Sequence, residues 1–276
     1  LLSRGDDPPI PPAPPAGGMG DALHAEWTKL RTLASTFWLL LGAAALTVTV
    51  SAAAAAAAAC PAGGCPEDPA KLSLTGIYLG QAVVAALAVM AVSGEYGTGM
   101  IRVTLAAMPR RGTVLAAKAV VLTGLVLVTG TVAVLPSLLA GRLILPGHGF
   151  GPAHGYPSLS LGDGPVLRAA VGSVLYLALI ALLSVGAAAA LREAAAAIGV
   201  VLGLLYLFPI IGAVVGRPDL ARHIQQIGPM TAGLAIQATT GVSSLPINPW
   251  AGLGVLAAWA AGALLLGGLL LRLRDA

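Results

Sequence analysis

Residues 166–216 read VLRAAVGSVLYLALIALLSVGAAAALREAAAAIGVVLGLLYLFPIIGAVVG, and their only charged side chains are Arg168, Arg192 and Glu193. A single helix over this stretch would be about 76 Å long at ~1.5 Å per residue. The hydrocarbon core of a bilayer is only about 30 Å thick. The stretch therefore predicts two membrane-spanning helices, Val166–Leu191 and Ala194–Gly216, joined by a tight hairpin at Arg192–Glu193, although neither Gly nor Pro marks the turn.

The rest of the chain has the same apolar character. Of its 276 residues, 57% are hydrophobic and only 9% are charged, and the mean hydropathy is +0.90. A soluble domain has about 25% charged residues, which cover its surface. This composition excludes an ordinary water-soluble globule. Aromatic residues make up only 4%, which favours closely packed membrane helices over a β-barrel with aromatic girdles.

Four further apolar runs complete a set of six predicted spans. They are Phe37–Ala59, Ile77–Gly94, Val114–Ala140 and Ala251–Leu271. The predicted fold class is an all-α polytopic membrane protein, with one membrane domain over residues 19–276. Residues 1–18 are rich in Pro, Ala and Gly, which cannot build a helix or a core. We expect this head to be either disordered or, with Met19 as the true start, not translated.

The basic residues are distributed unevenly between the two sides of the predicted membrane. With a cytoplasmic N-terminus, ten fall inside: Arg4, Lys29, Arg31, Arg102, Arg110, Arg111, Lys118, Arg192, Arg272 and Arg274. Five fall outside: Lys71, Arg142, Arg168, Arg217 and Arg222. Because Lys and Arg accumulate on the cytoplasmic side, both termini are expected inside. The positive charge is then explained by topology and anionic lipid head groups, and no nucleic-acid partner is expected.

The two cysteines lie in the loop between the first two spans, which this topology puts outside. They form the segment Cys60-Pro-Ala-Gly-Gly-Cys65. In an oxidising compartment the pair could close a small disulfide loop; the alternative is two free thiols at the membrane edge. No metal site is expected, since His148 and His154, which share a Gly-rich outer loop, are more simply solvated.

Two predicted cytoplasmic segments differ from the apolar runs. Asp21–Ala34 is amphipathic, with Leu23, Trp27, Leu30 and Ala34 on one stripe and Glu26, Lys29 and Arg31 off it. With Asp21 as its N-cap, it predicts a short helix in the membrane interface; the alternative is a plain extension of the first span.

The second segment follows Glu95, at the end of the second span. Thr98 can cap a new helical turn, and Pro109 disfavours helical geometry in the residue before it. This predicts a short helix, Gly99–Met108, parallel to the membrane with charges at both ends. Its shape favours docking of a cytoplasmic partner; the alternative is a loop anchored by its basic residues.

Several short motifs occur in a fixed order around the six predicted spans. They are Glu26-Trp27-Thr28-Lys29-Leu30-Arg31, Gly94-Glu95-Tyr96-Gly97-Thr98-Gly99-Met100-Ile101-Arg102, Pro109-Arg110-Arg111, Ala117-Lys118, Pro249-Trp250-Ala251-Gly252-Leu253 and Arg272-Leu273-Arg274-Asp275-Ala276. In this order the chain, from Met19 to its end, resembles the permease subunits of ABC-2 type transporters, especially actinobacterial ones. Each motif alone has little specificity, and the order carries the resemblance.

The resemblance implies a six-helix exporter subunit in a bacterial plasma membrane. It would pair with a second copy, or a related permease, and with cytoplasmic ATPase subunits that hold the ATP and Mg. The segments Asp21–Ala34 and Glu95–Met108 would contact the ATPase. The candidate contact residues are Glu26, Lys29, Arg31, Glu95, Tyr96, Thr98, Arg102, Arg110 and Arg111. The family also places short outer helices before the last span, which Arg217–Pro249 fits.

Catalytic motifs are missing from the sequence. No Gly-x-x-x-x-Gly-Lys-[Ser/Thr], His-Glu-x-x-His or Gly-x-Ser-x-Gly pattern occurs, so the chain is expected to be neither an ATPase nor another enzyme, with no cofactor of its own. The alternative function is a stand-alone secondary transporter or channel. It is disfavoured because the predicted spans carry no ionisable residue near their centres and show no internal repeat.

Overall fold

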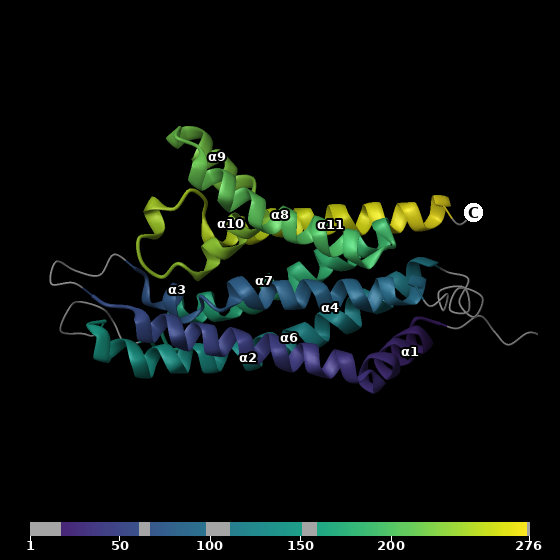
Figure 1. Cartoon of the computed structure of the whole chain (residues 1–276), viewed down its shortest axis with the longest axis horizontal. Coiled ribbons are helices and arrows are strands. Elements are labelled where there is room, and N and C mark those ends of the chain that lie inside the picture. Colours follow the sequence, from purple (N-terminus) through teal and green to yellow (C-terminus); the bar gives the residue numbers. More distant parts are fainter. Residues whose placement is uncertain (1–17, 61–66, 98–110, 151–158, 275–276) are drawn as a thin grey trace, which may run out of the picture.

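The computed structural model describes residues 18–60, 67–97, 111–150 and 159–274, which contain helices and no strand (Figure 1). Six helices are long and apolar enough to cross a membrane. They are α2 (Ala34–Ala57), α4 (Ile77–Gly97), α6 (Arg111–Ile144), α7 (Gly164–Leu191), α8 (Ala194–Val214) and α11 (Pro249–Arg274). The six predicted spans and the all-α fold class are confirmed, and the observed helices extend most of the predicted ranges by a few residues.

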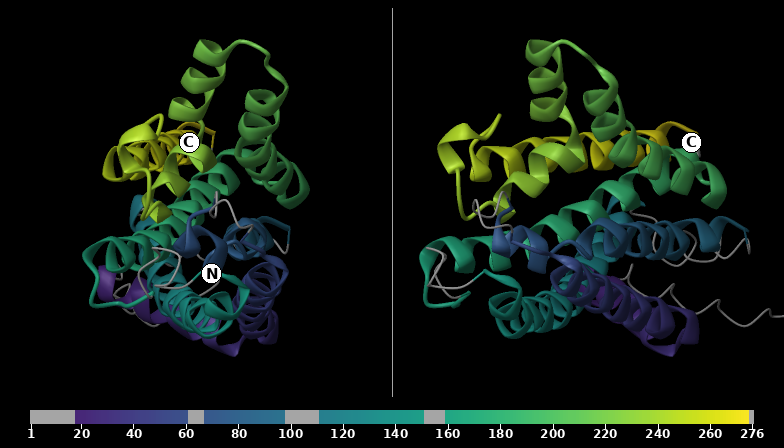
Figure 2. Two further views of the ribbon diagram at one scale, coloured as in Figure 1. Left: turned by 90° about the vertical axis from the view of Figure 1, so that its left-hand side faces the viewer. Right: turned by 60° about the vertical axis from the view of Figure 1, so that its left-hand side comes forward.

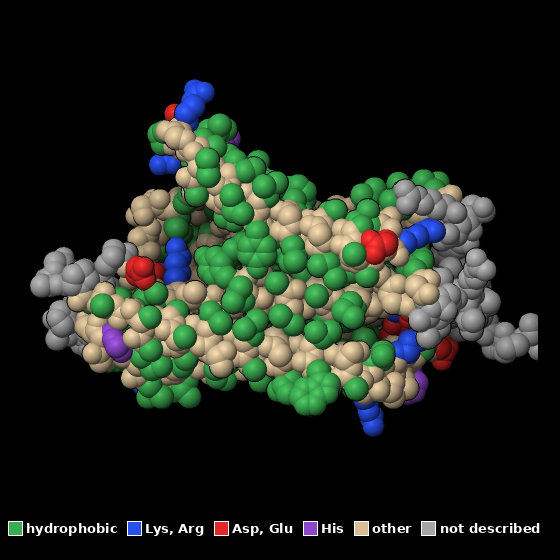
Figure 3. All heavy atoms as spheres, in the orientation of Figure 1, with side chains coloured by type: hydrophobic (Ala, Val, Ile, Leu, Met, Phe, Trp, Pro, Cys, Tyr) green, Lys and Arg blue, Asp and Glu red, His purple; other side chains and the backbone are tan. Residues whose placement is uncertain are grey.

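Helix α7 lies at the centre of the bundle, in contact with α4, α6, α8 and α11 (Figure 2). In its most apolar window, 61% of the residues are buried inside the chain, compared with 17% for α8. Figure 3 shows hydrophobic side chains along the flank of the bundle, with charged ones mainly near the two ends. Such an apolar flank suits lipid, because it has few polar groups for water to solvate.

The hairpin between α7 and α8 is as tight as predicted. Arg192 ends α7 in the left-handed region, with φ of 63°, a conformation that costs a non-glycine residue about 1 kcal/mol. The Glu193 carboxylate then accepts hydrogen bonds from the backbone N–H of Ala195 (2.8 Å) and Ala196 (2.5 Å). Because this cap satisfies the first free N–H groups of α8, the turn forms without Gly or Pro.

Replacing Glu193 by Ala is expected to lower the unfolding midpoint slightly at neutral pH. The hydrogen bonds from Ala196 and Ala195 lower the pKa of the Glu193 carboxyl below its ordinary value of 4.5. Its stabilisation is therefore present above that value and is lost as the pH falls through the lowered pKa. Thermal unfolding in detergent at pH 7 and pH 3 checks this, since the wild type and the variant should converge at pH 3. Glu193→Gln, which keeps one acceptor oxygen, should lose less; a pH-independent difference would contradict the cap.

Small residues bring α7 and α11 into direct backbone contact. A Cβ atom built on Gly186 of α7 would lie 2.4 Å from the carbonyl carbon of Ala263, and one on Gly267 of α11 would lie 2.6 Å from the Gly186 oxygen. No side chain fits in such a space. Close approach at small residues is how membrane helices gain packing where lipid offers no hydrophobic drive between them.

Short helices lie at the end of the bundle opposite the C-terminus (Figure 1). They are α3 (Pro69–Ser73), η1 (Leu145–His148), α9 (Pro218–Ile227), α10 (Pro229–Gly233), η3 (Leu234–Gln237) and η4 (Val242–Ser244). Helix α9 projects away from the bundle (Figure 1). The apolar stretch Met230–Ala238 packs against α7 and α11, and Met230 and Ile236 are buried.

Two charged side chains fix the segment after η3. The Asp68 carboxylate accepts hydrogen bonds from the backbone N–H of Thr239 (2.5 Å) and Thr240 (2.8 Å). The Arg168 guanidinium donates to the Ala238 carbonyl at 2.5 Å. Both charges therefore bind backbone groups that no regular helix would satisfy.

Candidate functional site

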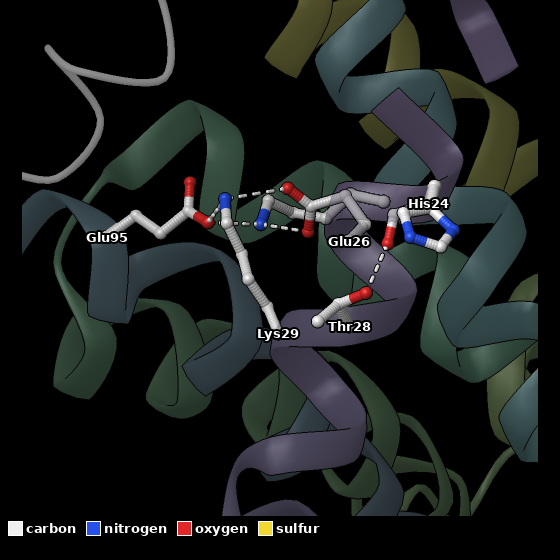
Figure 4. A network of polar contacts seen from close by, with 6 residues as sticks. His24, Glu26, Thr28, Lys29 and Glu95 are labelled. Atoms are coloured by element: carbon white, nitrogen blue, oxygen red, sulfur yellow. Dashed lines mark hydrogen bonds and ion pairs between the residues drawn. The ribbon is translucent and has the colours of Figure 1, made fainter. Parts of the chain in front are cut away.

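Four charged side chains meet at the end of the bundle where α1 (Met19–Thr32) contacts α6 and approaches the end of α4 (Figure 4). The Lys118 ammonium on α6 lies 2.7 Å from a carboxylate oxygen of Glu26 on α1 and 2.7 Å from one of Glu95 on α4. The Lys29 ammonium on α1 lies 3.1 Å from Glu26 and 2.9 Å from Glu95. These four residues are called the ion network below.

Most of the ion network is removed from water. The exposed fraction of the side chain is 2% for Glu26, 5% for Lys118 and 9% for Glu95, while Lys29 keeps 30%. Two carboxylates and two ammonium groups balance in charge, so each buried charge has opposite partners. Charges inside an apolar bundle are costly unless they are paired in this way.

The ion network decides which face of α1 is buried. Ala22, Glu26 and Leu30 face the bundle, whereas Trp27 is 46% exposed. The predicted apolar stripe is thus divided, with Leu30 inside and Trp27 outside. The predicted N-cap was also wrong: the helix begins at Met19, and the Asp21 carboxylate instead accepts a hydrogen bond from the Gly18 backbone N–H at 2.8 Å.

The ion network also changes the protonation of Lys29. Burial disfavours its charged form, but the hydrogen bond and charge of Glu95 and the charge of Glu26 outweigh this, so the pKa of Lys29 lies above its ordinary 10.5. A raised pKa means that the stabilisation is complete at neutral pH and is lost only as the pH rises through the raised value. Lys29 is therefore charged at neutral pH.

The other predicted contact residues lie at the same end of the bundle or outside the described residues. Arg31 on α1 is exposed. The Arg192 guanidinium carbon lies 5.4 Å from the ring centroid of Tyr96, a cation–π distance that ties the α7–α8 hairpin to the end of α4. Thr98, Arg102, Arg110 and the predicted helix Gly99–Met108 lie outside the described residues, and of Arg111 only the backbone, which starts α6, is described.

The structure gives Glu26 and Glu95 an internal role. Both were expected to contact a partner, but their carboxylates are buried and held by lysines of the same chain. Lys118 was counted only among the basic residues of the inner side, and its place in the ion network was missed. The signal was present, because an ionisable residue one turn inside a span needs a partner of opposite charge.

Of the two cysteines in the predicted disulfide, only Cys60 lies among the described residues. The Cys60 backbone N–H donates to the His148 carbonyl at 3.1 Å, which ties the segment after α2 to the end of η1. No free cysteine occurs in the described part of the chain, but Cys65 lies outside it, so the pairing stays a prediction. In the same described ranges no group of three or more His, Cys, Asp or Glu side chains could hold a metal ion.

Comparison with known proteins adds no further identification. No protein-family model matches the chain, and no curated protein sequence matches it. What the fold and the site establish is an integral membrane protein of helical architecture with six candidate spans and a buried ion network at one end.

Proposed function

We propose that the chain is the membrane-spanning permease subunit of an ATP-binding cassette exporter of the ABC-2 type, which couples to a separate ATPase subunit. The observation that carries the proposal is the ion network. Through it α1 is bound to the ends of two spans, α4 and α6. A partner that displaces α1 would therefore displace both spans with it.

The physical basis is that a buried ion pair resists separation. Moving α1 away from α4 and α6 would break the pairs Glu26–Lys118 and Lys29–Glu95 and leave each of the four charges with fewer partners in an apolar surrounding, which is unfavourable. The four residues are therefore expected to move together, because their ion pairs then stay intact. Helix α1 would therefore transmit a movement of a bound partner to the spans α4 and α6. This agrees with the role of the corresponding segment in the family that the sequence motifs resemble.

Docking of the ATPase would use basic groups. Arg31 on α1 is exposed, and Arg102, Arg110 and Arg111 are further candidates from the sequence. Tyr96 and Thr98 are two more candidates from the sequence. The resemblance implies a bacterial plasma membrane as the location. Both termini would be cytoplasmic, because Lys and Arg accumulate on the cytoplasmic side. ATP and Mg would bind the ATPase and not this chain.

A second permease copy would pack on the least covered side of the bundle. Helix α8 buries few of its residues within the chain. An apolar groove of about 680 Å³ between α7, α8 and α11 includes Leu204 and Trp259 in its lining. Two such surfaces facing each other would form an apolar path, which suits a lipid, a peptide or a hydrophobic drug as the substrate.

Co-purification tests the coupling. When the tagged full chain is purified from its native host, we expect a protein with a P-loop to accompany it. Arg102→Glu and Arg31→Glu should each reduce the recovered partner about tenfold, since reversing one contact charge costs roughly 1–2 kcal/mol of binding. The matched control is Arg222→Glu on α9, which lies at the opposite end of the bundle and should leave recovery unchanged. Quantitative mass spectrometry of the eluate gives the ratio.

Two outcomes would count against the proposal. One is that the control reduces recovery as much as Arg31→Glu, which would indicate non-specific adhesion. The other is substrate transport by the purified chain alone in liposomes without ATP, which would favour the stand-alone transporter.

A further inference from the structure

Helix α9 buries none of its residues within the chain, and its side chains divide into two faces. Leu220, Ile224 and Ile227 recur at i, i+4 and i+7 on one side, whereas Asp219 and Arg222 lie on the other. A helix with one apolar and one basic side is typical of segments that lie in a membrane interface. Leu220 and Ile227 are 48% and 54% exposed, so the chain itself leaves most of the apolar side uncovered.

The contacts of α9 place it level with two of the spans. Three residues link it to Val214, the last residue of α8. Helix α9 then runs back beside α8 (Figure 2), where a Cβ atom built on Gly212 would lie 3.7 Å from a side-chain carbon of Ile224. At its end, the Ile227 carbonyl accepts a hydrogen bond from Nε1 of Trp259 at 2.9 Å. Gly212 and Trp259 belong to the candidate spans α8 and α11, so α9 lies beside membrane-spanning helices.

The surroundings of α9 at this level determine what covers its apolar side. Ile210 and Val214 on α8 are exposed side chains of a helix that is long and apolar enough to span the membrane, and in a bilayer such side chains meet acyl chains. Hydrophobic side chains continue from the flank of the bundle towards the projecting α9 (Figure 3). This continuity with the lipid-facing surface of α8 indicates that lipid also covers α9.

Two arginines at the start of α9 favour anionic head groups as the polar partner. Arg217, the N-cap residue, and Arg222 are both exposed, and within the described ranges neither forms an ion pair. Asp219 is the only acidic residue of α9, so positive charge is in excess here. Guanidinium groups bind phosphate oxygens through paired hydrogen bonds. Anionic head groups would neutralise this charge, whereas the same surface of a second copy would repeat it.

We propose that α9 binds the head-group layer of the leaflet in which α8 ends, and that its preferred partner there is an anionic phospholipid. Arg217 and Arg222 would pair with the lipid phosphates. Leu220 would contact the acyl chains next to the head groups. Helix α9 would therefore hold the end of α8 at a fixed depth in the bilayer, and this proposal does not depend on the transport function.

The depth of single side chains in the bilayer tests the proposal. Leu220→Cys and Arg222→Cys, on the two sides of α9, are labelled with a nitroxide, and the full chain is reconstituted into liposomes of phosphatidylglycerol and phosphatidylcholine. Power saturation compares access of oxygen, which dissolves in lipid, with access of a water-soluble nickel chelate. We expect the label at Leu220→Cys to favour oxygen and the label at Arg222→Cys to favour the chelate. The wild-type chain, labelled in the same way, gives the background from Cys60 and Cys65.

Lipid selectivity at α9 provides the second arm. A fluorophore on Leu220→Cys is quenched by phosphatidylglycerol or phosphatidylcholine that carries a nitroxide near the start of one acyl chain, so the ratio of quenching reports the preference at α9 itself. We expect phosphatidylglycerol to be preferred about 25-fold, because each basic residue near an anionic lipid surface contributes about fivefold. Arg217→Gln with Arg222→Gln should remove this preference, and the corresponding pair of Lys substitutions should keep most of it.

The matched control is Arg142→Gln, which removes an exposed arginine at the end of α6, outside α9, and should leave the preference at Leu220→Cys unchanged. Other outcomes overturn the proposal. Access of the chelate to both labels would place α9 in water. Low access of both reagents to the Leu220→Cys label, with dipolar broadening between labels, would show that a second copy covers α9. Equal quenching by the two lipids would show that Arg217 and Arg222 bind no anionic head group.

Discussion

Replacing Lys118 by Met is expected to destabilise the chain by about 3–5 kcal/mol, the cost of breaking a buried ion pair from one side. The lysine is the most buried cation of the ion network and holds both Glu26 and Glu95 at 2.7 Å. Without it, two buried carboxylates share only Lys29. Chemical unfolding in detergent micelles, followed by helical circular dichroism, measures the loss.

A control substitution shows whether the loss of stability comes from removing a buried cation or from removing any cation. Arg31→Met removes a cation from the exposed face of the same helix α1 and should change stability by less than about 1 kcal/mol. The double variant Lys118→Met with Glu26→Gln should recover part of the loss, since it leaves the neutral pair of Lys29 and Glu95. If Lys118→Met costs no more than Arg31→Met, then the ion network does not hold the helices together.

The spans could be predicted from the sequence because the bilayer imposes a simple rule. Only a helix satisfies its own backbone hydrogen bonds over about 20 apolar residues. The pair Arg192–Glu193 shows that the same rule can also predict a turn between two spans. No local turn signal marks it, but the length limit of one span required a break, and a charged pair was the only place for it.

The ion network could not be predicted in the same way, because it depends on how distant helices pack. Lys118 and Glu26 are 92 residues apart in the sequence, and Lys29 and Glu95 are 66 apart. An apolar stripe on α1 suggested which face meets the membrane, but the choice of the buried face was made by charges on α4 and α6. The role of Asp68, which binds Thr239 and Thr240, was missed for the same reason.

Replacing Gly186 by Val is expected to destabilise the bundle by about 3 kcal/mol, the upper part of the usual range for overpacking. A Cβ at this position would lie 2.4 Å from the carbonyl carbon of Ala263 and 2.5 Å from the nitrogen of Leu264. Helix α11 would have to move away from α7, the central helix, which would also open the contact at Gly267. The same unfolding measurement detects the loss.

The matched control is Gly254→Val on α11, where a Cβ meets no atom within 4 Å; its effect should stay within about 0.5 kcal/mol, as for substitutions away from tight contacts. A second substitution tests whether the loss of stability comes from contact with the backbone of α11. The atoms close to Gly186 are backbone atoms of Ala263 and Leu264, so Ala263→Gly, which removes only a side chain, should not rescue Gly186→Val. Rescue would mean that α7 and α11 are held apart by side chains, and equal losses at Gly186 and Gly254 would mean that their backbones are not in contact at all.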